Sequence, residues 1–161
     1  YMQSLLTPDL AFTTHKPIPY SLNNYTEKNL NKDTIKLAEI NALAFRERYE
    51  LLLEYVEEMG AKPICVTQPH IFTKIINDEK LGVANVMNEY NGLDFDYSLK
   101  SLNSQIYDLC GPLTIDLYNY EFKNEHFYDG IHTTELGSTL IGNVMADFII
   151  ENNFHSILTS K

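Results

Sequence analysis

The sequence contains no tryptophan and only two cysteines among its 161 residues. Two cysteines are too few for the disulfide framework that replaces a core in small secreted domains. Apolar residues make up 44% of the chain, and a chain of this length and composition can bury a sizeable core. We therefore expect residues 1–161 to form a single domain.

Positive charge is also scarce. Twelve Lys and Arg residues stand against 22 Asp and Glu residues, which gives a formal net charge of -10. Contacts to a phosphate backbone need clustered Lys and Arg side chains, and this chain offers no such cluster. Nucleic acid is therefore excluded as an expected partner.

Long hydrophobic runs are absent as well. No stretch of about 18 apolar residues occurs, so no segment is predicted to cross a bilayer. The chain begins at Tyr1 without a basic and apolar signal sequence. Because we expect the true N-terminus to lie upstream, these residues alone assign no compartment.

The two cysteines occupy different kinds of predicted element. Cys65 lies inside a candidate strand, and Cys110 lies at a helix end just before Gly111 and Pro112. The favoured interpretation is a pair of small buried apolar side chains. A disulfide bridge stays open as an alternative, because the strands that the two cysteines flank could be neighbours.

The longest predicted helix runs from Asp33 to Gly60, after an irregular excursion over residues 1–32. Asn31 or Asp33 can cap its start, Gly60 permits a left-handed C-terminal cap, and Pro63 prevents continuation. Apolar residues recur at spacings of three and four, as expected for one buried helix face: Ile35, Ala38, Ala42, Phe45, Tyr49, Leu52, Leu53, Val56 and Met59.

Two short apolar runs, Ile64 to Thr67 and Leu113 to Leu117, are typical of buried strands in a parallel sheet. Between them the sequence predicts a polar, lid-like segment over 77–96 with a short helical patch at 83–90. A second amphipathic helix follows, with Leu99, Leu102, Ile106 and Leu109 on its apolar face. This alternation predicts an α/β fold with helices packed on both faces of a parallel sheet.

A short motif near the C-terminus carries the strongest chemical signal. Asp129 and His132 are three residues apart across a turn marked by Gly130, so the carboxylate can orient the imidazole. Thr134 is a suitable N-cap and Glu135 places negative charge in the first helical turn. The helix that follows has an apolar stripe that docks it on a core: Leu136, Leu140, Ile141, Val144, Met145, Phe148 and Ile149.

This Asp-x-x-His block before a C-terminal helix resembles the last conserved block of the SGNH (GDSL-like) ester hydrolases. The resemblance covers roughly Asp33 to Asn152, including the strand Pro63 to Pro69 and the strand Leu113 to Leu117. It implies a three-layer α/β/α fold of the flavodoxin-like kind. It also implies a serine ester hydrolase in which Asp129 accepts from His132 Nδ1–H while Nε2 takes a proton from the serine, with no cofactor.

The sequence departs from that family in one respect. The Gly-Asp-Ser nucleophile block, the oxyanion glycine block and the Gly-x-Asn-Asp block are missing, and we expect them upstream of Tyr1. None of the eight serines has the strand-turn-helix setting of a nucleophile. We therefore expect this chain alone to be inactive, to expose an unpaired sheet edge, and to need its missing segment or to associate with itself.

The resemblance also bears on substrate and location. The resemblance implies a small-molecule, lipid or glycan acyl ester as substrate, and it slightly favours the cell envelope or secretion. Eleven tyrosines could stack on sugar rings, although packing with hydrated hydroxyl groups is the favoured interpretation. Gln68 and His70 follow the first predicted strand, at the sheet edge where ligands bind, and are candidate substrate-binding residues.

Three alternatives remain at this point. His126, Asp129 and His132, with Glu125 or Glu135, have suitable side chains for a metal site, although we expect none. The chain could instead belong to a catalytically inactive binding module of the same fold. An acyltransferase, which passes the acyl group to an acceptor other than water, is the third alternative.

Overall fold

The computed structural model describes residues 25–83 and 91–154. Within them the fold is mixed α/β, with helices α2 (Lys32–Glu58), α3 (Gly92–Cys110) and α4 (Glu135–Glu151). Strands β1 (Cys65–Val66) and β4 (Thr114–Ile115) form a small parallel sheet, and β2 (Thr73–Ile76) and β3 (Glu79–Gly82) form a hairpin. Short 3₁₀ turns complete the list: η1 (Glu27–Asn29), η2 (Gly111–Leu113) and η3 (Asn124–His126). The expected irregular excursion falls mostly on residues 1–24, outside the described residues.

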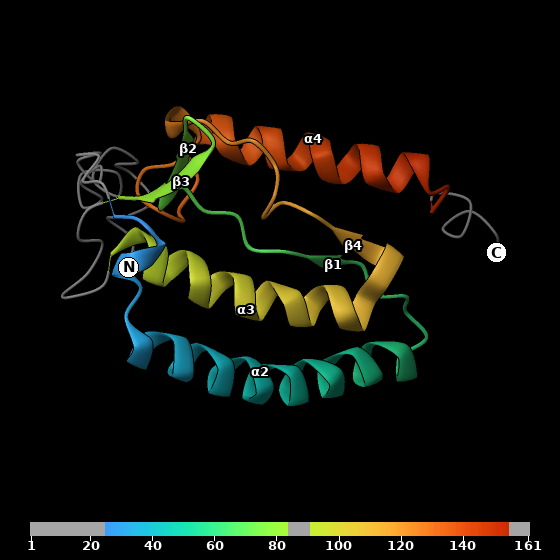
Figure 1. Cartoon of the computed structure of the whole chain (residues 1–161). Helices are drawn as coiled ribbons and strands as arrows, with labels where there is room; N and C mark the ends of the chain where they lie inside the picture. Colours follow the sequence, from blue (N-terminus) through green and yellow to red (C-terminus); the bar gives the residue numbers. More distant parts are fainter. Residues whose placement is uncertain (1–24, 84–90, 155–161) are drawn as a thin grey trace, which may run out of the picture.

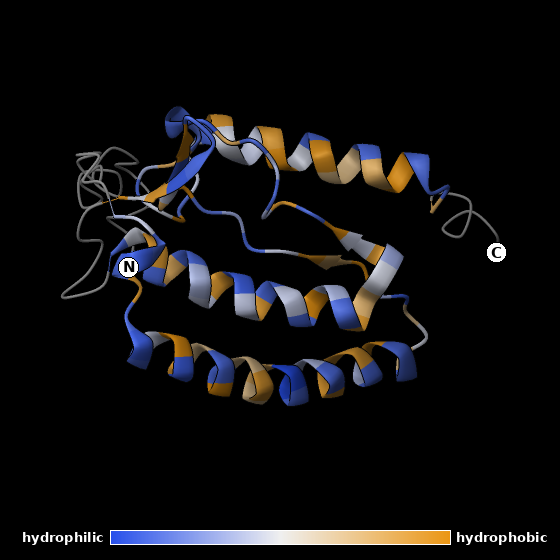
Figure 2. Ribbon diagram, viewed as in Figure 1, coloured by the Kyte–Doolittle hydropathy of each residue, from blue (hydrophilic) through white to orange (hydrophobic). Residues whose placement is uncertain are grey.

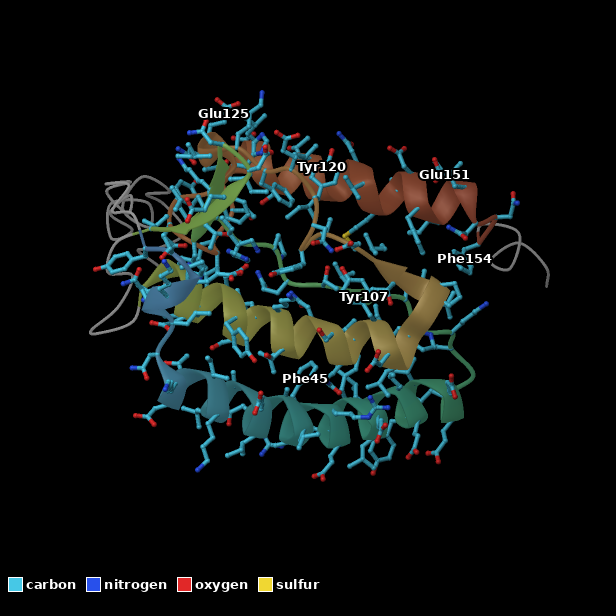
Figure 3. The ribbon with its side chains drawn as sticks, viewed as in Figure 1. Phe45, Tyr107, Tyr120, Glu125, Glu151 and Phe154 are labelled. Carbon is cyan, nitrogen blue, oxygen red and sulfur yellow. A yellow bond between two sulfur atoms is a disulfide. The ribbon has the colours of Figure 1, made fainter. Side chains whose placement is uncertain are left out.

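The predicted long helix is confirmed as α2, but two residues of its predicted buried face, Leu52 and Met59, are 53% and 77% exposed. The side chain of Asn31 accepts the Asp33 N–H at 2.9 Å at its start, and Gly60 has φ +77° just beyond its end. Figure 1 shows α2 lying along α3, and Figure 3 shows Phe45 on the side of α2 that faces α3. The buried residues of α2 are Thr34, Ala38 and Ala42.

The predicted parallel pairing is confirmed by β1 and β4. Cys65 is opposite Thr114 and Val66 is opposite Ile115, and the Thr67 N–H extends the ladder to the Ile115 carbonyl at 3.1 Å. Both strands are shorter than the apolar runs that predicted them.

A buried side chain ends β1. Asn103 of α3 accepts the Gln68 N–H at 2.9 Å and donates to the Gln68 carbonyl at 3.1 Å. Its amide occupies the backbone groups that a continued strand would offer to a neighbour. At 1% exposure, Asn103 is among the most buried side chains of the described residues.

The expectation of a polar, lid-like segment over 77–96 is wrong where the structure describes it. Asn77 and Asp78 both have positive φ, at +51° and +64°, and form the two-residue turn of the β2–β3 hairpin. Asn91 then caps α3, which begins at Gly92, several residues earlier than the apolar pattern indicated. Most of the expected helical patch, residues 84–90, lies outside the described residues.

Cys65 and Cys110 form a disulfide, so the favoured interpretation of two separate buried thiols is wrong. The bridge ties β1 to the C-terminal end of α3. Its buried sulfur atoms pack with Ile106, and four half-buried side chains surround this cluster: Phe45, Tyr49, Leu53 and Leu109. The small apolar core on this side of the sheet is thus built around a covalent link.

Helix α4 lies on the opposite side of β1 and β4 from α2 and α3 (Figure 1). Apolar residues run along its whole length (Figure 2), yet Gly137 is its one buried residue in the described structure. Leu136 and Ile150 are 52% and 61% exposed. None of the described helices is both long and apolar enough to span a membrane.

Candidate functional site

The turn before α4 brings Asp129 and His132 together. Asp129 Oδ2 lies 2.6 Å from His132 Nδ1, while Asp129 Oδ1 accepts the backbone N–H groups of Ile131 at 2.9 Å and His132 at 2.8 Å. A carboxylate can only accept, so we infer that Nδ1 carries the ring proton and that Nε2 is the basic nitrogen of the neutral imidazole.

The two side chains of this pair differ in exposure. The His132 side chain is 60% exposed and the Asp129 side chain only 22%. Burial by itself would raise the pKa of Asp129, but the N–H groups of His132 and Ile131 and the His132 ring outweigh it and lower that pKa. Asp129 therefore stays ionised beside His132.

The turn is held from two directions. The Tyr128 N–H donates to the His132 carbonyl at 2.8 Å, and the Ile71 N–H, from the loop after β1, donates to the Gly130 carbonyl at 3.0 Å. A Cβ at Gly130 would meet the Phe72 ring, so the loop and the turn approach each other closely. The loop after β1 thus fixes the turn that carries His132.

The start of α4 adds a third support. The hydroxyl of Thr134 accepts the Gly137 N–H at 3.2 Å as the predicted cap, and it donates to the Glu125 carbonyl at 2.8 Å. The Thr134 N–H donates to the His126 carbonyl at 3.0 Å. Gly137 is needed there because a Cβ would lie 2.0 Å from the same carbonyl oxygen. Helix α4 is therefore anchored through its first turn.

Gln68 lies near the His132 turn, as its position after β1 suggested. Together with Pro69 it lines a cavity of about 660 Å³ whose walls also include Ile131 and Thr133, the two neighbours of His132. The rest of the lining is mostly apolar and comes from α2, α3, α4, β1 and the residues just after β1 and β4: Phe45, Tyr49, Val66, Thr67, Leu99, Leu102, Asn103, Ile106, Leu117 and Ile141.

His70 does not line the cavity that Gln68 and Pro69 line. Its Nδ1 accepts the Phe72 N–H at 3.1 Å, which leaves the ring proton on Nε2, 3.0 Å from Asp96 Oδ1. Both ring nitrogens are thus engaged within the protein, and the side chain is 5% exposed. His70 lines a second cavity, on the side of the β-hairpin, that His132 does not line.

Asp96, which the sequence did not single out, is the centre of that second region. Besides His70 it accepts the Tyr118 hydroxyl at 2.7 Å and the Lys80 ammonium at 3.0 Å. Burial would raise the pKa of Asp96, yet the hydrogen bonds from His70 and Tyr118 and the charge of Lys80 lower it to about 2. The sequence did contain a signal for buried polar contacts, because Asp96 and Asn103 lie on the same face of α3 as the apolar residue Ile106.

The described serines do not resemble nucleophiles. Ser98, Ser101 and Ser104 donate to the carbonyls four residues earlier in α3, at 2.8 to 2.9 Å. Ser138, in the first turn of α4, pairs with the Thr133 hydroxyl at 2.8 Å. The other serines that the sequence offers, Ser4, Ser21, Ser156 and Ser160, lie outside the described residues.

The metal-site alternative receives no support from the geometry. The ring of buried His126 accepts the Lys123 N–H at 3.1 Å through Nδ1 and packs edge-on against Phe122. Within residues 25–83 and 91–154, no three His, Cys, Asp or Glu side chains form a group that could hold a metal ion. His126 therefore serves the turn before α4 rather than a site shared with Asp129 and His132.

Comparison with protein-family models, curated proteins and solved structures finds no match. The function of the site is therefore inferred from its geometry and from the Asp-x-x-His sequence pattern.

Proposed function

We propose that this chain is the C-terminal part of a serine ester hydrolase of the SGNH type. In this proposal His132 is the general base that takes the proton from a serine hydroxyl as it attacks the ester carbonyl. Asp129 holds the imidazole in the correct tautomer and stabilises the imidazolium that forms. His132 then returns the proton to the departing alcohol, and water releases the acyl group in the second half of the reaction.

The observation that carries this proposal is the double hold of Asp129 on His132. One carboxylate oxygen meets Nδ1 at 2.6 Å, and the other accepts the backbone N–H of the same residue at 2.8 Å. Such a hold fixes the position of the ring as well as its tautomer, and general-base catalysis depends on both. A solvated histidine that simply follows a capping turn would not require a carboxylate contact to its ring.

The surrounding architecture supports the same assignment. A parallel strand pair, helices on either side, and a turn with its Thr134 cap before the last helix follow the order of the resemblance. We interpret them as one part of a three-layer α/β/α domain. The loop after β1 also touches the His132 turn, through Ile71 and Gly130, as loops at the carboxyl edge of a parallel sheet do.

The apolar surface is consistent with further strands beside β1, which this proposal requires. In the described part of the chain, no strand pairs with the edge of β1 that faces away from β4. A cavity with mostly apolar walls is lined by Val66 of β1 and by the two neighbours of His132. Since apolar residues of α4 also stay exposed, further strands would cover both surfaces. The same strands would bring the nucleophilic serine and the oxyanion donors to His132.

Hydrolysis of p-nitrophenyl acetate by the protein from the complete reading frame tests this function. We expect turnover that falls about 1,000-fold or more in His132→Ala and stays unchanged in Asp147→Asn, which alters an exposed carboxylate on α4. Unchanged turnover in His132→Ala would refute the assignment. No turnover in the wild-type protein would favour a non-catalytic module, and acyl transfer to an added alcohol without net hydrolysis would indicate an acyltransferase.

A further inference from the structure

The second cavity is a groove between the β-hairpin and the segment after β4. Its volume is about 570 Å³, which is within the range of small-ligand sites. One wall comes from the loop and strands at 70–80, and the other from residues 118–122.

The floor of the groove is rigid and polar. Asp96 is 7% exposed and binds His70, Lys80 and Tyr118, which come from three separate segments of the chain. Because each donor is held by the same buried carboxylate, the floor is formed before any ligand arrives. Preformed polar groups of this kind orient a ligand at little cost in conformational entropy.

The wall after β4 presents aromatic rings. Tyr120 is 39% exposed, and its ring centroid lies 5.1 Å from that of Phe122. Figure 3 shows Tyr120 on the segment that follows β4. Tyr118 extends this aromatic surface to the floor, where Lys80 Nζ lies 5.9 Å from the Tyr118 ring centroid. Rings placed in this way offer flat apolar faces bordered by polar atoms.

The charge of the groove does not favour an anionic ligand. Its two lysines, Lys74 and Lys80, are balanced by the carboxylates of Asp96 and Glu121. A phosphate or an acidic polymer would therefore meet no net positive field. A lipid chain would meet too many polar groups, since burying them without hydrogen bonds is costly. A neutral ligand with hydroxyl groups on its edge and apolar C–H faces fits both features.

Both walls of the groove are connected to the His132 turn. Ile71, in the first wall, donates its N–H to the Gly130 carbonyl at 3.0 Å. Phe122, in the second wall, packs edge-on against Phe127 with ring centroids 5.3 Å apart, and Phe127 forms a bridge with Thr133. Both walls of the groove are therefore in direct contact with residues of, or next to, the His132 turn.

We propose that this groove binds a neutral oligosaccharide, with sugar rings stacked on Tyr120 and Phe122 and hydroxyl groups directed to the Asp96 cluster and Asn119. This assignment rests on the proposed function, because it takes the glycan to be the molecule that carries the ester. It makes the glycan, rather than a lipid or a simple alcohol, the leaving group of the hydrolysis. His132 lies outside the groove, so the sugar that carries the ester extends beyond it.

Binding can be tested separately from catalysis on the complete protein. Calorimetric titrations with xylohexaose, cellohexaose and chitohexaose should show at least one neutral oligosaccharide binding with a millimolar or lower Kd. Tyr120→Ala should weaken that binding about tenfold, through loss of the stacked face. The matched control is Tyr55→Ala, which removes a tyrosine 62% exposed on α2 and should leave binding unchanged.

Kinetics then link the groove to the reaction. Tyr120→Ala should raise KM for the acetylated form of the bound oligosaccharide, whereas Tyr55→Ala should change neither that KM nor the hydrolysis of p-nitrophenyl acetate, which has no sugar. The proposal is overturned if none of the three oligosaccharides binds, if Tyr120→Ala leaves binding unchanged, or if hexagalacturonate binds more tightly than they do. Sugar binding without hydrolysis of either ester would instead contradict the proposed function and leave the groove assignment standing.

Discussion

Asp129 holds His132 twice, through the imidazole Nδ1 at 2.6 Å and through the backbone N–H at 2.8 Å. A contact to the ring alone would leave the backbone of the turn free to move relative to the carboxylate. The second contact joins side chain and backbone into one unit, and the Ile71 N–H ties that unit to the loop after β1 through Gly130. The imidazole is thereby positioned by local and long-range contacts together.

Replacing Asp129 by Asn should separate orientation from folding. The Asn carbonyl oxygen can still accept the N–H groups of Ile131 and His132, so the turn should persist. Its amide can donate to Nδ1, which would move the ring proton to Nε2, and turnover of p-nitrophenyl acetate by the complete protein should fall about 1,000- to 10,000-fold. Asp147→Asn serves as the control for charge removal, and near-normal turnover in Asp129→Asn would contradict the account.

Two glycines of α4 should respond in opposite directions to the same change. A Cβ at Gly137 would lie 2.0 Å from the His126 carbonyl oxygen, whereas at Gly142 nothing lies within 4 Å. Gly137→Ala should therefore cost about 1–3 kcal/mol in the free energy of unfolding. Gly142→Ala should raise that free energy by about 0.5–1 kcal/mol through the better helix propensity of Ala. Urea unfolding measures both, and equal effects would show that Gly137 is not tightly packed.

The disulfide should supply much of the stability of this small core. Cys65 and Cys110 are 45 residues apart, and closing a loop of that size restricts the unfolded chain. The double variant Cys65→Ser, Cys110→Ser should lose about 2–4 kcal/mol in the free energy of unfolding. Dithiothreitol should destabilise the wild-type chain similarly and leave the double variant unaffected. If reduction leaves the free energy of unfolding of the wild-type chain unchanged, the bridge does not restrain the unfolded chain.

The elements that could be predicted from sequence are those with local signals. The apolar spacing of α2 predicted that helix, Thr134 predicted the start of α4, and the runs around β1 and β4 predicted a parallel pair. Asp129 and His132 are three residues apart, so the sequence could also predict that they lie together. Such features depend on residues that are close in the chain.

The features that were missed depend on distant partners or on weak turn signals. Asn77 and Asp78 form the hairpin turn without the glycine that usually marks it, so the hairpin was not predicted. The partners of Asp96 lie up to 26 residues away, and the disulfide pairing depends on the distance between β1 and the end of α3. Sequence spacing alone gives no such distances.

The lowered pKa of Asp96 predicts a loss of stability in acid. Its pKa is about 2 in the folded protein and about 3.8 without the fold, so below pH 4 the unfolded chain takes up the proton first. Above about pH 4 the ionised Asp96 carboxylate contributes about 2 kcal/mol to the free energy of unfolding, and this contribution is lost as the pH falls towards 2. The free energies of unfolding of the wild type and of Asp96→Asn, measured by unfolding titrations, should therefore converge as the pH falls from 4 to 2. A constant difference between the two over this range would contradict the assignment.

The most direct test of the central claim is labelling of the complete protein with a fluorophosphonate, which modifies a serine only where a general base activates it. Peptide mapping should place the label on a single serine encoded upstream of Tyr1. Labelling should be lost in His132→Ala and kept in Asp147→Asn. A label that persists in His132→Ala, that falls on a serine of α3, or that never forms on the folded protein would contradict the role of Asp129 and His132 proposed here.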